Sequence, residues 1–98
     1  TKENLRQIID LLLKDIHAKL AEKDAKLVVT DEAKELILEK GYDKRYGARP
    51  LKRAIQKLLE DKLSILSLTG QITSGCVITA DRKDNEITLT AVSNLLEN

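Results

Sequence analysis

The sequence predicts an α+β fold in which three to four helices pack on a small sheet of about three strands. Apolar residues recur at three- and four-residue spacing over about 1–22 and again over about 50–68, which is typical of amphipathic helices. Short β-branched or alternating segments lie between and after these helices. The element order, with helices first and two strands last, indicates one α+β domain spanning residues 1–98.

The first helix is expected from Thr1 to about Glu22. Its apolar side chains form one stripe along the helix. The stripe consists of Leu5, Ile8, Ile9, Leu12, Ile16 and Leu20. Leu11 and Leu13 widen it, so this helix is expected to contact more than one neighbour. Thr1 is a candidate N-cap.

A short strand and a second helix follow. The strand is expected over residues 26–30, which are rich in β-branched side chains. Thr30 or Asp31 is expected to cap a helix that runs to about Lys40, and Gly41 is placed to end it. The side chains expected to point inward are Ala33, Leu36 and Ile37.

A third helix is expected from Pro50 to about Asp61, with a last helical piece reaching about Leu68. Its apolar face consists of Leu51, Ala54, Ile55, Leu58 and Leu59. The run of residues 61–63 is a candidate interruption. The last piece is more apolar than a free surface requires, so some of its side chains are candidates for contact with a partner. These side chains are Leu63, Ile65, Leu66 and Leu68.

A terminal hairpin is expected from two strands, Cys76 to Ala80 and Ile87 to Val92. The second strand alternates between apolar residues and threonines. The polar run 81–86 is the expected turn. The end of the chain, residues 93–98, is expected to fray.

The composition limits the classes of function that this chain can have. The 98 residues include 17 basic and 16 acidic side chains, a net charge of +1, which argues against a general polyanion binder. Cys76 is the only cysteine and is expected to be a reduced thiol on a strand, which favours a cytoplasmic location. No apolar run approaches the length that spans a bilayer. The chain starts at Thr1 and contains no methionine, so we expect a fragment of a longer protein.

Most catalytic motifs are missing from the sequence. It contains no glycine-rich loop followed by Lys and Ser or Thr, and no nucleophile elbow. His17 is the only histidine and is expected to be solvated or structural. Glu35 and Glu39 fit solvated helix charges better than a catalytic pair. The chain alone is therefore not expected to be an enzyme or to hold a metal.

A basic group remains, centred on the stretch 41–53, which contains the only proline and both tyrosines. The group consists of Lys44, Arg45, Arg49, Lys52, Arg53 and Lys57. Gly47 permits a backbone conformation that a side chain would penalise, and Pro50 suits the first turn of a helix. Such a turn would hold Arg49 rigidly, and its forked donors match phosphate oxygens. The alternative is a solvated helix face.

This stretch resembles the sensor-two region of Clp-type AAA+ unfoldases. The residues that carry the resemblance are Gly41-Tyr42-Asp43 and Tyr46-Gly47-Ala48-Arg49-Pro50-Leu51-Lys52-Arg53-Ala54-Ile55-Gln56. The likeness covers roughly residues 3–92 and is greatest to the C-terminal small domain of the second ATPase module, as in ClpB and ClpC. Relatives usually carry a proline where Lys62 stands here.

The resemblance implies a small domain that packs beside a P-loop domain and closes its nucleotide cleft. Arg49, positioned by Gly47, Ala48 and Pro50, would reach the γ-phosphate of ATP. ATP or ADP with Mg²⁺ would be bound mainly by the large domain, which is absent from this sequence. The implied partners are that large domain, neighbouring subunits of a hexamer, polypeptide substrates and a candidate peptidase ring, with no nucleic acid and no membrane.

The other residues of the stretch leave alternatives open. Arg45, Lys52 and Arg53 are candidates for contact with a neighbouring subunit or for solvation. Tyr42 and Tyr46 are expected to anchor the turn by packing, and Tyr42 alternatively borders the adenine. A structural oligomerisation domain without nucleotide sensing, and a nucleic-acid module using the basic helix, remain the competing functions.

Overall fold

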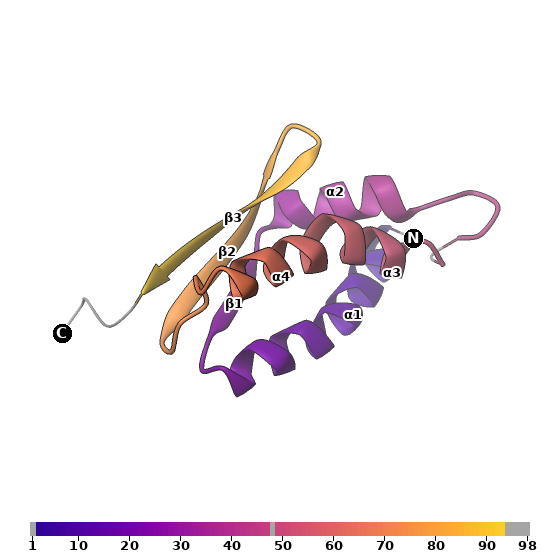
Figure 1. Ribbon diagram of the computed structural model, residues 1–98. Helices are drawn as coiled ribbons and strands as arrows, with labels where there is room; N and C mark the ends of the chain where they lie inside the picture. The colour runs from indigo at the N-terminus through magenta and orange to yellow at the C-terminus, as the bar shows by residue number, and fades with distance from the viewer. Residues whose placement is uncertain (1, 48, 94–98) are drawn as a thin grey trace.

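A computed structural model describes residues 2–47 and 49–93 and confirms the α+β prediction, with three helical segments and a mixed three-stranded sheet (Figure 1). The third helical segment has three parts, one of which, η1, is a π-helical turn. The elements are α1 (Lys2–Glu22), β1 (Lys26–Val29), α2 (Asp31–Gly41), α3 (Leu51–Ile55), η1 (Gln56–Glu60), α4 (Asp61–Leu68), β2 (Cys76–Lys83) and β3 (Glu86–Ser93).

The sheet has the order β1-β2-β3. β1 runs parallel to β2, and β2 runs antiparallel to β3, so that Leu27 lies opposite Ile78 and Ile78 opposite Ala91. The helices cover one face of the sheet (Figure 1). The other face is open, and it exposes Val28 and Val92.

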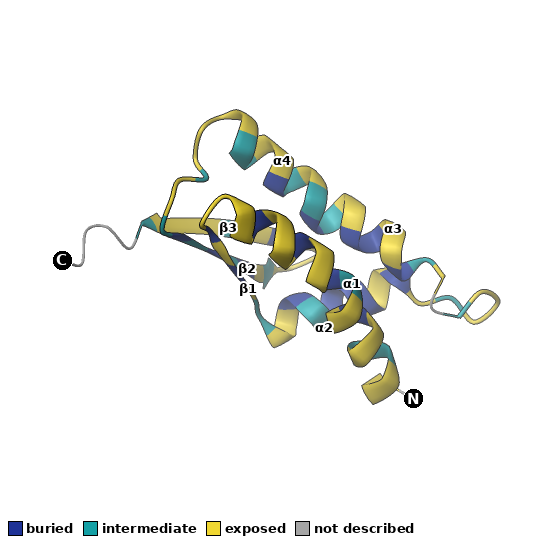
Figure 2. Cartoon of the chain, turned by 90° about the horizontal axis from the view of Figure 1, so that it is seen from below, coloured by how far each residue is buried: buried dark blue, intermediate teal, exposed yellow. Residues whose placement is uncertain are grey.

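The core lies between the helices and the covered face of the sheet, where Figure 2 shows the buried residues. It is aliphatic, as the lack of Phe, Trp and Met requires. The largest fully buried side chains are Ile9, Leu13, Leu36, Ile37, Leu51, Ile55, Leu59, Ile78 and Ile87. Cys76 is a buried free thiol on β2, as expected.

The apolar face of α1 differs in part from the expected stripe. Ile9, Leu13, Ile16 and Leu20 are its buried residues. Ile8 is exposed, and Leu11 is 61% exposed, because only one side of α1 meets the rest of the domain. The expectation that Ile8 and Leu11 pack inward was therefore wrong, whereas Leu13 lies in the core.

Thr30 caps α2, as one of the two expected candidates. Its hydroxyl accepts a hydrogen bond from the backbone N–H of Ala33 at 3.1 Å. Ala33 is itself fully buried, along with Leu36 and Ile37, as expected. The cap and the inward residues fix the direction in which α2 leaves the sheet.

Gly41 is the last residue of α2, as predicted, but its role is a close approach. A Cβ atom at Gly41 would lie 2.8 Å from Leu51 Cδ2 and 2.9 Å from Leu51 Cα. Glycine therefore allows the end of α2 to touch the start of α3. This contact joins the two ends of the intervening turn.

The interruption expected at residues 61–63 is wrong in position and in kind. The helix continues from Leu51 to Leu68, and its irregularity is η1, where the N–H of Asp61 bonds to the carbonyl of Gln56. Four of the five buried residues of this segment recur every four positions, at Leu51, Ile55, Leu59 and Leu63, and the fifth is Ala54. A regular α-helix has 3.6 residues per turn and would rotate such a series off its face. The wider π turn keeps these four side chains directed to the core.

The hairpin strands are longer than expected. β2 extends to Lys83 and β3 begins at Glu86, so the turn contains only Asp84 and Asn85, and Asp84 has a φ of 57°. The register from Cys76–Ser93 to Lys83–Glu86 pairs most of the polar run in the ladder. Ser93 was expected to fray but pairs with Cys76 at the end of β3, so that expectation was wrong. The expected cap at Thr1, the positioning role of Ala48 and the fraying of residues 94–98 lie outside the described residues.

Candidate functional site

The turn between α2 and α3 is closed by a short backbone bridge. The N–H of Gly47 donates to the carbonyl of Asp43 at 2.6 Å, and the N–H of Asp43 donates to the carbonyl of Gly47 at 3.2 Å. The Asp43 carboxylate also accepts a hydrogen bond from the backbone N–H of Arg45 at 2.7 Å. The turn is thus held by its own backbone and one aspartate.

Gly47 adopts the left-handed conformation expected for it, with a φ of +63°. No heavy atom lies within 4 Å of the place where a Cβ would stand. The requirement for glycine is therefore conformational and not steric. It lets the chain reverse after the Asp43 bridge and lead into Pro50.

Pro50 precedes the helix and sets its direction. Its φ is −72°, and its carbonyl accepts the N–H of Ala54 at 2.9 Å. The backbone N–H of Arg49 donates to the carbonyl of Tyr46 at 3.3 Å. Leu51, directly after Pro50, is fully buried against Gly41. Arg49 therefore lies two residues before Leu51, whose side chain is fully buried in the core.

The two tyrosines do not anchor the turn to the core, so that expectation was wrong. Tyr42 is 47% exposed and Tyr46 is 56% exposed. The anchoring role falls to Leu51 and Gly41, whose contact closes the base of the turn. The tyrosine rings are consequently available at the surface.

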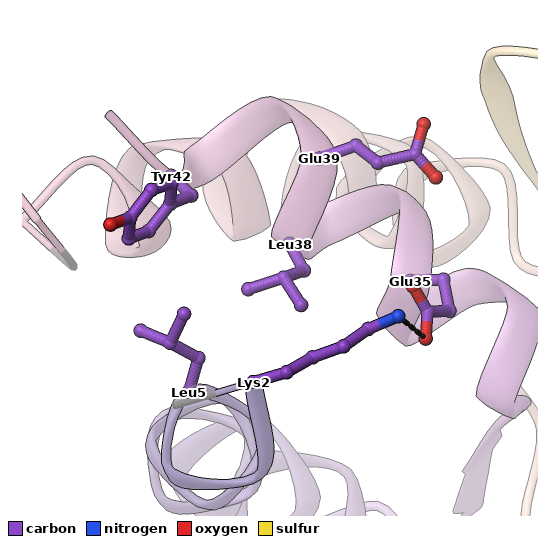
Figure 3. Close-up of a pocket in the computed structure, with 6 residues that line it drawn as sticks. All are labelled: Lys2, Leu5, Glu35, Leu38, Glu39 and Tyr42. Atoms are coloured by element: carbon purple, nitrogen blue, oxygen red, sulfur yellow. Dashed lines mark ion pairs between the residues drawn. The ribbon is translucent and has the colours of Figure 1, made fainter. Parts of the chain in front are cut away.

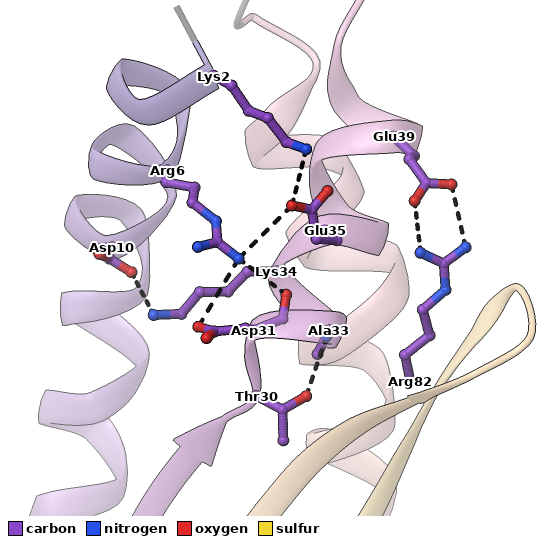
Figure 4. Close-up of polar contacts among 10 residues, drawn as sticks. All are labelled: Lys2, Arg6, Asp10, Thr30, Asp31, Ala33, Lys34, Glu35, Glu39 and Arg82. Atoms are coloured by element: carbon purple, nitrogen blue, oxygen red, sulfur yellow. Dashed lines mark hydrogen bonds and ion pairs between the residues drawn. The ribbon is translucent and has the colours of Figure 1, made fainter.

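The side chain of Arg49 is exposed and has no hydrogen bond or ion pair within residues 2–47 and 49–93. The same is true of Arg45 and Arg53. The two remaining arginines, in contrast, are both bound to carboxylates (Figure 4). Arg6 lies 3.8 Å from Asp31 and 3.8 Å from Glu35, and Arg82 binds Glu39 in a bidentate pair.

The basic group is segregated from the acidic residues in sequence. Residues 44–59 contain six basic side chains and no acidic one, whereas the whole chain carries a net charge of +1. The remainder of the chain therefore has a net charge of −5. All six basic residues of this segment are exposed. The structure brings Lys52, Arg53 and Lys57 onto the helix that begins beside Arg49.

A groove lies beside the turn, between the start of α1 and the end of α2 (Figure 3). Its volume is about 510 Å³. The residues that line it are Lys2, Leu5, Glu35, Leu38, Glu39 and Tyr42. Sequence reasoning missed it, because α1 and α2 contribute to it from segments more than 25 residues apart. The start of α1, the end of α2 and the turn share one end of the molecule (Figure 1).

Glu35 and Glu39 point to different cationic partners and do not form a carboxylate pair. Glu35 accepts from Lys2 at 3.1 Å, while Glu39 binds Arg82 at 2.5 and 3.1 Å (Figure 4). The hydrogen bond from Arg82 lowers the pKa of the Glu39 carboxyl below its ordinary value. This pair joins α2 to the hairpin, and no sequence pattern indicated it. His17 is exposed on α1.

The described part of the chain contains neither a metal-binding cluster nor a membrane-spanning helix. No group of three or more His, Cys, Asp or Glu side chains there could hold a metal ion. No helix there is long and apolar enough to cross a bilayer.

The fold and the turn define the class of protein: a small α+β domain that presents an unpaired arginine on a glycine- and proline-shaped turn before a helix. A family model described as the C-terminal, D2-small domain of ClpB protein matches residues 1–80, and the chain belongs to this family.

Similar proteins include the ATP-dependent Clp protease ATP-binding subunit ClpC of Staphylococcus aureus (strain USA300). It is 45% identical over 86 residues, which are 88% of this chain and 10% of that protein. The protein of the same name from Staphylococcus epidermidis is 46% identical over 86 residues, again 88% and 10% of the two chains. The chain thus spans about a tenth of the length of the relatives it matches.

Proposed function

We propose that this chain is the nucleotide-sensing and ring-assembly subdomain of a longer, cytoplasmic ATP-dependent protein unfoldase. Its role is to complete the ATP site of a P-loop domain that is not in this sequence. The domain itself holds no nucleotide; ATP or ADP with Mg²⁺ is bound mainly by the P-loop domain. The parent acts on polypeptides as a hexamer, and a peptidase ring is a candidate partner, since the ClpC relatives are named as subunits of a protease.

The observation that carries this proposal is the unpaired Arg49 on a fixed turn. The guanidinium has no partner among the described residues, although both arginines outside the turn region have carboxylate partners. The backbone beneath it is held by the Asp43–Gly47 bridge and by buried Leu51. Because the backbone is already held, binding of an external anion by Arg49 does not require the turn itself to be ordered.

A γ-phosphate is the anion that fits nucleotide sensing. It offers three oxygens to the forked donors of arginine, and such charge-assisted hydrogen bonds are short and strong. The contact exists with ATP and is lost with ADP. A differential contact of this kind biases an equilibrium between two domain arrangements. Hydrogen bonds to charged groups are worth about 1.5–3 kcal/mol, or roughly a ten- to hundredfold bias.

The test replaces Arg49 with Ala and with Lys in the full-length protein. We expect Arg49→Ala to reduce ATP turnover, or ATP-dependent assembly measured by sedimentation velocity, by roughly ten- to hundredfold. Arg49→Lys should restore only part of the loss, because a lysine cannot form the bidentate contact. Lys14→Ala, on the exposed face of α1, is the control for a lost surface charge.

The Arg49→Ala variant distinguishes nucleotide sensing from a purely structural role. Normal turnover and normal hexamers in Arg49→Ala would contradict the proposal. An assembly defect of equal size in ATP and ADP would instead support a structural oligomerisation domain without sensing. Far-UV circular dichroism of the variants should match the parent, since Arg49 makes no side-chain contact among the described residues.

A further inference from the structure

Five exposed residues lie close to Arg49 in the sequence, in the turn before it and on the helical segment after it. We call it the basic face, and it consists of Arg45, Tyr46, Lys52, Arg53 and Lys57. All five side chains are exposed, and no hydrogen bond or ion pair of these side chains occurs within the parts of the chain that the structure describes. None of these side chains is needed to hold the turn, which is fixed by backbone hydrogen bonds, the Asp43 carboxylate and the buried Leu51.

The arrangement of these charges works against the stability of the domain. Arg53 and Lys57 are four residues apart on one helical segment, a like-charge spacing that costs about 0.2–0.5 kcal/mol. Lys52 and Arg53 lie in the first turn of that segment, which contains no acidic residue. Positive charges are unfavourable at that end of a helix dipole. Contacts within the domain do not explain why the basic side chains gather here.

The composition favours a protein partner. Arginine and tyrosine are enriched in protein–protein interfaces and supply many of their energetic hot spots. Both tyrosines and three of the five arginines of the chain fall within residues 42–53, and all are exposed. Every arginine outside this segment is neutralised by a carboxylate in the domain itself. A carboxylate from outside would neutralise the remaining ones in the same way.

We propose that the basic face is a docking surface for a carboxylate-bearing surface of another protein chain. This inference deepens the proposed function, because it assigns a partner chemistry to the residues around Arg49. A nucleic acid fits less well, since its continuous phosphate charge requires a long basic surface. Here the basic run ends at Lys57 and is followed by Glu60 and Asp61, and the remainder of the chain has a net charge of −5.

The test is site-specific photocrosslinking in the full-length protein. A benzoylphenylalanine probe replaces Gln56, which is exposed between Arg53 and Lys57, and crosslinked peptides are mapped by mass spectrometry. We expect crosslinks to a protein segment that contains several Asp or Glu residues. The double variant Arg53→Glu and Lys57→Glu should reduce the crosslinked fraction by about tenfold, equivalent to about 1.4 kcal/mol. A probe at Lys14, on the exposed side of α1, is the control.

Three outcomes would overturn the inference: crosslinking no stronger than at the Lys14 position, crosslinks to a segment without acidic residues, and crosslinks to nucleic acid. Reversing the charge of the crosslinked acidic residues should rescue the double variant, and failure to rescue would also count against the inference. Arg49→Ala separates the two proposals. If nucleotide sensing fails but docking is correct, that variant has normal ATP turnover and the Gln56 crosslink is retained.

Discussion

Gly41→Ala tests whether the contact between α2 and α3 positions the Arg49 turn. Alanine normally stabilises a helix interior relative to glycine by about 0.5–1 kcal/mol. Here the added Cβ would lie 2.8 Å from Leu51 Cδ2, 2.9 Å from Leu51 Cα and 3.1 Å from the Ala54 Cβ. Attractive contacts between carbon atoms lie at about 3.5–4.0 Å. Since one of these atoms is backbone and Leu51 is fully buried, the start of α3 must move.

Such overpacking costs about 1–3 kcal/mol, which exceeds the gain in helix propensity. We therefore expect Gly41→Ala to lower the free energy of unfolding by about 1–2 kcal/mol, and the melting temperature by roughly 5–15 °C for a domain of this size. Urea and thermal unfolding of the chain, followed by far-UV circular dichroism, measure both. A variant as stable as the parent, or more stable, would refute the steric argument.

Gly47→Ala provides the comparison. Its φ is +63° and there is open space around it, so the cost there is the left-handed conformation alone, about 1–2 kcal/mol. Of the two variants, only Gly41→Ala should displace Leu51, visible as changed methyl resonances of that residue in NMR spectra.

Three other predictions follow from the helix, its charges and the hairpin. Deleting Lys57 should convert η1 to regular α-helix, and circular dichroism should show that the chain remains folded. Deleting Lys14 from the regular helix α1 should instead rotate the core residues that follow it by about 100° and unfold the domain. Equal damage from both deletions would contradict the π-turn argument. Lys52→Glu should stabilise the chain by about 0.3–1 kcal/mol in urea, because a negative charge suits the start of a helix, and a loss of stability would oppose it. Glu39→Gln should lower the free energy of unfolding at neutral pH, since the stabilisation from Arg82 requires the ionised carboxylate. The difference in free energy from the parent should vanish as the pH falls below about 4.3 and through the lowered pKa of Glu39. A difference that is independent of pH would exclude this pair as the cause.

The sequence was most informative where one side of an element is buried. Periodicity predicted the three helical segments and the last strand, and β-branched composition predicted β1. Thr30 was identified as a candidate cap from its residue type and place. The π turn was not predicted, because four-residue spacing at Leu51, Ile55, Leu59 and Leu63 fits both a π-containing helix and a drifting α-helix. The choice between them depends on which surface the helix meets, and this is a tertiary property.

The candidate site could be predicted from the sequence only in part. The turn and the left-handed conformation of Gly47 agree with what the residue types of this stretch indicated. Tyr42 and Tyr46 were expected to anchor the turn by packing, because large aromatic side chains bury much apolar surface. Both are exposed. The bidentate pair of Glu39 and Arg82 joins residues 43 positions apart, and local spacing carries no information on such pairs.

The contacts around the turn also determine how a force on Arg49 would be transmitted. Arg49 is two residues from Leu51, which packs against Gly41 at the end of α2, and α2 is joined to the hairpin by Glu39 and Arg82. Closely packed protein cores resist continuous deformation. A phosphate contact at Arg49 would therefore move α2, α3 and the hairpin together and would not merely bend the turn. Amide hydrogen exchange within the domain should accordingly be alike in ATP and ADP, with differences confined to the turn and to surfaces that meet other domains.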